Sequence, residues 1–143
     1  MSAPTTVRLA RAIPALPVRD AAAAVGFYRE RLGFDVLHHD AGFAVLRRGD
    51  AELHLWEAGD ETWRGRASFE RPVRSGAESF LAGTGSCRVE TAGVDALYVE
   101  LRERDVLHPV SRDGVSTTDF GTREFATLDG DGNLITFFQW TAA

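Results

Sequence analysis

The chain carries the same strand–turn–strand pattern twice, and this internal repeat restricts the fold more than any other feature of the sequence. The first copy covers residues 43–56 with a polar turn at 47–50, and the second covers residues 125–138 with a polar turn at 129–132. In both copies apolar and polar residues alternate on either side of a turn rich in Gly and Asp, which is typical of a β-hairpin. A pattern that occurs twice in a short chain predicts a fold built from two similar modules.

Each hairpin follows the same succession of elements, a strand and then a helix, so each copy predicts a βαβββ module. In the first copy the residue pattern predicts these elements over residues 10–18, 21–32, 34–39, 42–48 and 51–56. In the second copy it predicts them over residues 86–91, 95–104, 106–109, 124–128 and 133–140. Asp20 and Asp95 stand where helix-capping side chains are expected.

The two modules predict an α+β fold, in which they form a curved mixed sheet with helices on its outer face. We expect one domain over residues 1–143, with modules at about 10–57 and 86–140 and a connection at 58–85. Pro14 and Pro17 predict that the first strand is an edge strand or contains a hinge, because proline removes a ladder donor. Within the connection we expect residues 79–82 to form a turn that packs on the sheet.

The composition restricts the class of protein. With 44% hydrophobic and 26% charged residues, the chain has the balance of a soluble globular protein. It contains no apolar run of membrane-spanning length and no signal-peptide pattern at its start, so we expect a cytoplasmic protein with no membrane partner. Its one cysteine, Cys87, excludes an intramolecular disulfide. The net charge of −5 argues against nucleic-acid binding and favours a cationic small ligand.

Several short stretches resemble the vicinal oxygen chelate superfamily, which includes glyoxalase I, extradiol dioxygenases, fosfomycin-modifying enzymes and bleomycin resistance proteins. They lie at residues 18–20, 27–28, 31–34, 40–43, 47–50, 121–126 and 129–133. The resemblance extends over about residues 10–140, apart from most of the connection. Arg-Arg-Gly-Asp at 47–50 and Arg-Glu-Phe-Ala at 123–126 are similar to the drug-binding branch in particular, and bleomycin resistance proteins are the nearest in likeness.

The resemblance also allows the sequence to be tested for a metal site. In the superfamily's enzymes a divalent metal is held by His and Glu side chains from the first and last strands of the modules. Aligning the two hairpins places His54 opposite Thr136, and the first-strand positions fall near Ile13 and Ser86. One ligand in four positions does not make a metal site, and the other three histidines lie elsewhere. We therefore expect no metal bound by the protein and no cofactor.

Other catalytic arrangements are not indicated. Asp129 and Asp131 are explained by turn chemistry. Cys87, in an apolar strand, is expected to be a small buried hydrophobe. No nucleophile–base pair is visible in the sequence. We expect a binding protein and not an enzyme.

A cavity on the curved sheet, lined by aromatic side chains, is the expected ligand site. We predict ligand contacts at nine positions, namely Asp40, Phe43, His54, Trp56, Trp63, Arg88, Phe120, Thr136 and Phe138. An ordinary hydrophobic core is the alternative explanation for the aromatic members. Strand alternation assigns five further residues to the helix-facing core, namely Val45, Leu53, Leu55, Ile135 and Phe137.

The resemblance implies a homodimer with two ligand clefts at the subunit interface, and aromatic pairs that stack on a flat heteroaromatic ring such as a bithiazole. The first strand is implied to cross to the partner at Pro14 or Pro17. Arg88 stands where the family resembled has a tryptophan. The implied function is sequestration of a bleomycin-family glycopeptide antibiotic, for resistance or producer self-protection, with any metal entering bound to the drug. The alternatives are a metal-dependent enzyme of the same superfamily and a dimeric binder of another planar metabolite.

Overall fold

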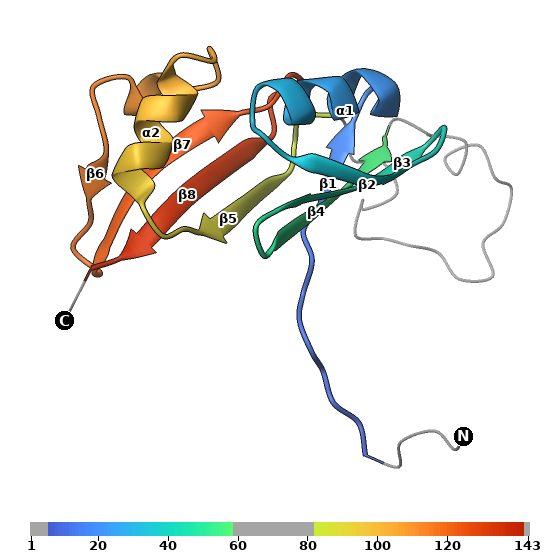
Figure 1. Cartoon of the computed structure of the whole chain (residues 1–143), viewed down its shortest axis with the longest axis horizontal. Helices are drawn as coiled ribbons and strands as arrows, with labels where there is room; N and C mark the ends of the chain where they lie inside the picture. Colours follow the sequence, from blue (N-terminus) through green and yellow to red (C-terminus); the bar gives the residue numbers. More distant parts are fainter. Residues whose placement is uncertain (1–5, 59–81, 142–143) are drawn as a thin grey trace, which may run out of the picture.

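The structure is a computed structural model that describes residues 6–58 and 82–141, and it contains two βαβββ modules side by side (Figure 1). The first module consists of β1 (Ala15–Val18), α1 (Ala21–Glu30), β2 (Asp35–His39), β3 (Phe43–Arg48) and β4 (Ala51–Glu57). The second consists of β5 (Ser86–Glu90), α2 (Val94–Arg102), the 3-10 helix η3 (Pro109–Ser111), β6 (Ser116–Thr117), β7 (Thr122–Leu128) and β8 (Leu134–Trp140).

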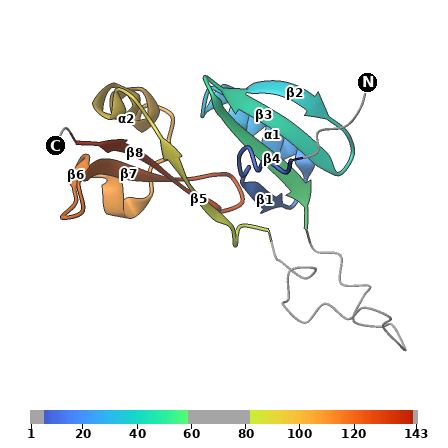
Figure 2. The ribbon, with the colours of Figure 1, turned by 90° about the horizontal axis from the view of Figure 1, so that it is seen from below.

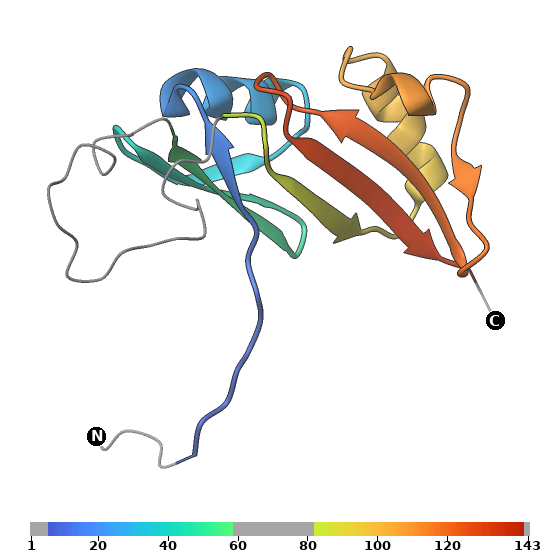
Figure 3. The same cartoon turned by 180° about the vertical axis from the view of Figure 1, so that it is seen from behind.

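The two modules have the same strand order. Each contributes a mixed four-stranded sheet, ordered β1-β4-β3-β2 in the first module and β5-β8-β7-β6 in the second. In both sheets the first strand pairs parallel with the last, and the hairpin strands are antiparallel. The helices lie on one side of the sheets, and β1 and β5 are the edge strands toward the middle (Figures 1 and 3). The predicted fold class and the predicted edge position of the first strand are confirmed.

The helix ends follow from local residues, with one error in the prediction. Asp20 caps α1 as predicted, because its side chain accepts a hydrogen bond from the Ala23 amide at 3.0 Å. The predicted cap at Asp95 is wrong. Gly93, with φ of 75°, occupies the N-cap of α2, and Asp95 lies in the first turn, 2.6 Å from Arg123. The strand predicted at 106–109 is reduced to one bridge between Leu107 and Thr127, followed by η3.

The core lies between the helices and the sheets. It includes Leu53, Leu55, Ile135 and Phe137, as the alternation predicts. Val45 is an exception, because it is half-buried and lies opposite His54 in the β3–β4 ladder, on the other face of the sheet. The β3 residues that enter the core are its two neighbours, Ala44 and Leu46.

Turn length explains why the alignment of the two hairpins fails in one strand. Phe43 is paired with Trp56, whereas Phe125 is paired with Phe137 and is buried in the core. The β7–β8 turn contains one more residue than the β3–β4 turn, so β7 is displaced by one position relative to the sequence alignment. A displacement of one residue turns a strand's side chains to the opposite face. The true counterpart of Phe43 is therefore Glu124.

A buried polar cluster joins the two modules. The Asp129 carboxylate accepts a hydrogen bond from the Tyr28 hydroxyl at 2.7 Å and another from Asn133 Nδ2 at 2.8 Å. Asn133 Nδ2 also donates to the Pro17 carbonyl at 2.8 Å, and its Oδ1 accepts from the Gly85 amide at 2.8 Å. Asp129 has its predicted turn role, and in addition it connects α1 to the β7–β8 turn.

The chain before β1 runs away from both sheets (Figures 1 and 3). Two of its apolar side chains are almost fully exposed, with 92% of Val7 and 93% of Leu9 accessible. Pro14 marks the point where this segment reaches the sheet, because its carbonyl accepts a hydrogen bond from the His54 amide at 2.9 Å. The described residues of the same chain do not cover Val7 and Leu9, so burying them would require another surface.

Candidate functional site

Figure 2 shows the face of each sheet that is turned away from its helix, here called the open face. The strand registers place most of the predicted ligand residues on it. On the open face of the first module, Phe43, His54 and Trp56 project from β3 and β4. Phe43 lies directly opposite Trp56 in the ladder, and its ring contacts the His54 imidazole edge to face, with 5.2 Å between centroids. All three are half-buried. This is an aromatic surface that a flat ring can cover.

Glu52 fixes the polar edge of this surface. Its carboxylate, of which 10% is exposed, lies 2.8 Å from His54 Nε2 and 3.1 Å from both Arg47 Nη2 and Arg11 Nη2. The hydrogen bond with His54, followed by that from Arg47, holds the pKa of Glu52 below its usual value. The sequence prediction missed Glu52, although its position two residues before His54 places both on one strand face.

The open face of the second module combines aromatic rings with an ion pair. Arg88 on β5 contacts the Glu124 carboxylate at 2.7 and 3.4 Å. Its guanidinium carbon lies 4.7 Å from the centre of the Phe138 ring and 5.9 Å from that of Phe120. Phe138 in turn contacts Trp140 edge to face at 5.5 Å. The structure thus brings together three of the predicted ligand residues, namely Arg88, Phe120 and Phe138. Glu124 also belongs to this group, and the sequence prediction missed it.

The other predicted positions are placed less directly. Thr136 lies opposite Arg88 on the same open face and is half-buried. Asp40 is exposed in the β2–β3 turn, where its carboxylate accepts from the Gly42 amide at 3.0 Å and lies 2.9 Å from His38 Nε2. The hydrogen bond with His38 lowers the pKa of Asp40. These local bonds account for Asp40 without a ligand. Trp63 and nearly all of the turn predicted at 79–82 lie outside the described residues.

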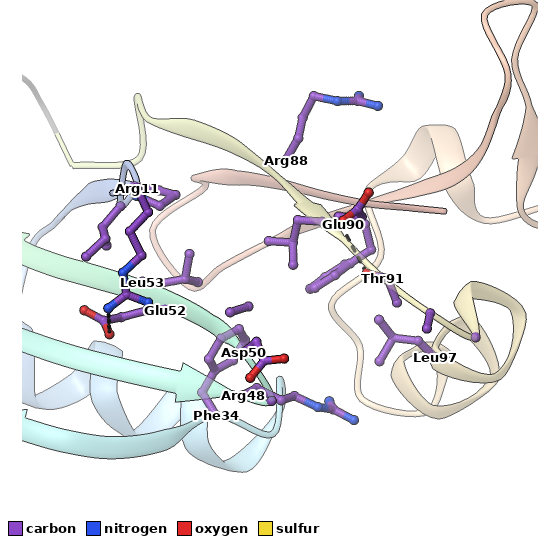
Figure 4. Close-up of a pocket in the computed structure, with 18 of the residues that line it drawn as sticks. Arg11, Phe34, Arg48, Asp50, Glu52, Leu53, Arg88, Glu90, Thr91 and Leu97 are labelled. Carbon is purple, nitrogen blue, oxygen red and sulfur yellow. Dashed lines mark hydrogen bonds and ion pairs between the residues drawn. The ribbon is translucent and has the colours of Figure 1, made fainter. Parts of the chain in front are cut away.

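A cleft of about 840 Å³ lies at the seam between the modules (Figure 4). It is lined by residues from the N-terminal segment, the β3–β4 hairpin, β5 and α2. Of the eight predicted ligand residues that the structure describes, only Arg88 borders it. Figure 4 shows the Arg88 side chain leaving β5 away from Leu97 and Phe34. The cleft's Arg48 is bound by Glu100 at 2.8 Å. We therefore assign the site to the open faces, where exposed rings and the ion pair meet, and not to the seam.

Comparison with known proteins assigns the chain to a family. The chain matches the model of the Glyoxalase/Bleomycin resistance protein/Dioxygenase superfamily over residues 8–137. It is 49% identical over 131 residues to bleomycin resistance proteins of Geobacillus stearothermophilus and Staphylococcus aureus, covering 90% of this chain and 96% of each relative. The chain belongs to this superfamily, in its bleomycin resistance branch. The bleomycin-binding protein of bleomycin-producing Streptomyces verticillus, solved with copper(II)-bleomycin, superposes with a TM-score of 0.68 at 28% identity, covering 96% of this chain and 99% of that one. The resemblance read from the sequence is confirmed.

The donor set of this superfamily member does not fit the metal of the superfamily's enzymes. Among the residues that the structure describes, no three His, Cys, Asp or Glu side chains group closely enough to hold a metal ion. His54 lies opposite Ala15 on β1, and Thr136 lies opposite Arg88 on β5, so the positions paired with them on the first strands supply no further ligand. Burial raises the pKa of the Cys87 thiol to about 11, which leaves it protonated at neutral pH. None of the described helices is long and apolar enough to cross a membrane.

Proposed function

We propose that this protein binds a bleomycin-family antibiotic and holds it away from DNA without altering it chemically. The observation that carries the proposal is the 49% identity to bleomycin resistance proteins across 90% of the chain. The relative solved with copper(II)-bleomycin, at 28% identity, has the same fold over nearly the whole chain. The mechanism is mass action, because a drug molecule in the site is not free to reach its target.

The open faces supply suitable contacts for such a drug. Phe43 and Trp56 on one module, and Phe120 on the other, present rings on which the planar bithiazole stacks, while Phe138 supports Arg88 beside Phe120. The net charge of −5 favours a ligand with a cationic tail. Any metal is proposed to arrive in the drug's own chelate.

The described residues support binding more than catalysis. His54 is the imidazole on the open face, and its Nε2 is engaged by Glu52. General acid–base or nucleophilic chemistry requires a reactive group within hydrogen-bond reach of a base that is free to act. No such pair accompanies His54 in the described part of the site.

We also propose that the protein is a homodimer with its ligand clefts at the subunit interface. Two features support this. The apolar side chains of Val7 and Leu9 are almost fully exposed, and each open face is a half-buried aromatic surface. A second copy can cover both, with the chain turning at Pro14 or Pro17. The proposed place of action is the cytoplasm, between the entry of the drug and its target.

Protection of plasmid DNA from cleavage by iron-bleomycin tests the proposal. Sequestration predicts that protection rises in proportion to added protein and is complete near one binding site per drug molecule. A chemical conversion would instead protect DNA at protein concentrations far below that of the drug. Cleavage that continues unchanged at a large excess of protein would refute the binding function.

A further inference from the structure

We propose that Arg88 is a specificity-determining residue of the antibiotic site, and that its guanidinium is the flat surface on which a planar heteroaromatic ring of the ligand stacks. This inference rests on the proposed function and assigns one part of the site to one part of the ligand. It follows from the placement of Arg88 between an aromatic ring on one side and solvent on the other.

The guanidinium is held in place from two directions. Phe138 lies beneath it, with 4.7 Å from Cζ to the ring centre, and Glu124 fixes its edge at 2.7 Å from Nη2 to Oε2. Glu124 is fixed in turn by the Thr122 hydroxyl, which donates to Oε2 at 2.9 Å. An arginine held at both its face and its edge loses little conformational freedom when a ligand binds.

The outer side of the guanidinium remains available. The Arg88 side chain is 46% exposed, and the neighbouring Phe120 is 59% exposed. Planar guanidinium groups stack on aromatic faces and on heteroaromatic rings through both dispersion and cation–π attraction. Arg88 therefore offers the kind of flat contact that an aromatic side chain offers, extended at its side by Phe120.

The charge of Arg88 is compensated, which decides which ligands the surface accepts. Glu124 pairs with it directly, and the hydrogen bond from Arg88 lowers the pKa of Glu124, so this carboxylate is ionised at neutral pH. Glu90 is exposed and is separated from Arg88 by one residue, so it lies on the same face of β5. With one cation and two anions in this group, a cationic tail next to the stacked ring is attracted.

Titration calorimetry with two ligands tests the inference. The ligands are a bleomycin with a cationic tail and bleomycinic acid, which ends in a carboxylate. Arg88→Lys keeps the charge but removes the planar group, and Arg88→Trp restores a flat surface without the charge. Glu124→Gln keeps the size of the side chain and releases the charge of Arg88. Arg123→Lys is the matched control, because Arg123 is also paired with a carboxylate, Asp95, but on another side of β7.

Stacking predicts that Arg88→Lys weakens the binding of both ligands by about tenfold, because the planar contact is lost. The dissociation constants of Arg88→Trp are expected to lie within about threefold of those of the wild type. The control variant Arg123→Lys is expected to bind both ligands as the wild type does. Glu124→Gln is expected to weaken binding of the cationic bleomycin more than binding of bleomycinic acid. Equal binding by wild type and Arg88→Lys would overturn the role of Arg88 and leave the proposed function intact. A wild-type protein that binds neither ligand would overturn both.

Discussion

Removal of one hydroxyl group from the buried cluster should reveal how strongly the two modules are held together. Tyr28 is fully buried and donates to Asp129 Oδ2 at 2.7 Å. Substitution Tyr28→Phe removes this donor and keeps the ring, so no large cavity forms. The carboxylate keeps Asn133 Nδ2 on the same oxygen at 2.8 Å, and the backbone amides of Asp131 and Asn133 on the other at 2.9 and 2.8 Å.

The expected loss follows from the charge of the acceptor. A hydrogen bond to a charged group contributes about 1.5–3 kcal/mol, and a buried carboxylate that loses one of its donors is poorly solvated. We expect Tyr28→Phe to lower the free energy of unfolding by about 2 kcal/mol. Tyr98→Phe is the matched control. Tyr98 on α2 is also buried, but its hydroxyl donates to the neutral carbonyls of Ser111 and Arg112 at 2.9 and 3.1 Å. We expect Tyr98→Phe to lower the free energy of unfolding by about 1 kcal/mol.

Urea denaturation at neutral pH and fixed protein concentration measures both losses. The reasoning would be refuted if Tyr98→Phe cost as much as Tyr28→Phe. A second readout is alkaline pH. Burial, followed by the charge of Asp129, raises the pKa of Tyr28 well above its usual value. Above about pH 10 the unfolded chain therefore loses a proton that the folded protein keeps, and stability falls. Tyr28→Phe should remove this contribution to the fall.

Three further predictions concern the site and the assembly. Phe43→Ala and Phe120→Ala should each weaken bleomycin binding by about tenfold while cooperative unfolding is retained, as measured by titration and urea denaturation. His54→Ala should weaken binding by less. An equal or greater loss of binding in His54→Ala would indicate that His54 is a metal ligand. Purified protein should hold far less than one equivalent of divalent ion by elemental analysis after dialysis, and a stoichiometric content would favour the enzyme. The chain should sediment as a dimer at micromolar concentration and dissociate more readily after Pro14→Ala; a stable monomer with intact fold would argue against the interface.

The sequence predicts the elements well where the determining interactions are local. The cap at Asp20 depends on an amide three residues away. Core assignments at Leu53, Leu55, Ile135 and Phe137 follow from alternation within β4 and β8, which needs no knowledge of neighbouring strands.

Val45 lies two residues after Phe43 on β3, so alternation places both side chains on the open face, and the assignment of Val45 to the core was wrong. The other failure arises where a face depends on register between strands. Phe125 lies on the opposite face from the one that the aligned hairpins indicate, because the β7–β8 turn holds one additional residue. The same shift turned Glu124 toward Arg88, so the ion pair over Phe138 was not predictable from the sequence alignment. The contact joins residues 36 positions apart, and register decides it.

Isothermal titration of the metal-stripped protein with bleomycin tests the central claim most directly. Sequestration predicts saturable heat with one binding site per chain, quenching of tryptophan fluorescence as the drug enters, and drug of unchanged mass recovered afterwards. Absence of heat and of quenching at tens of micromolar drug would contradict antibiotic binding and favour another planar ligand. Recovery of a chemically altered drug would contradict sequestration and favour an enzyme.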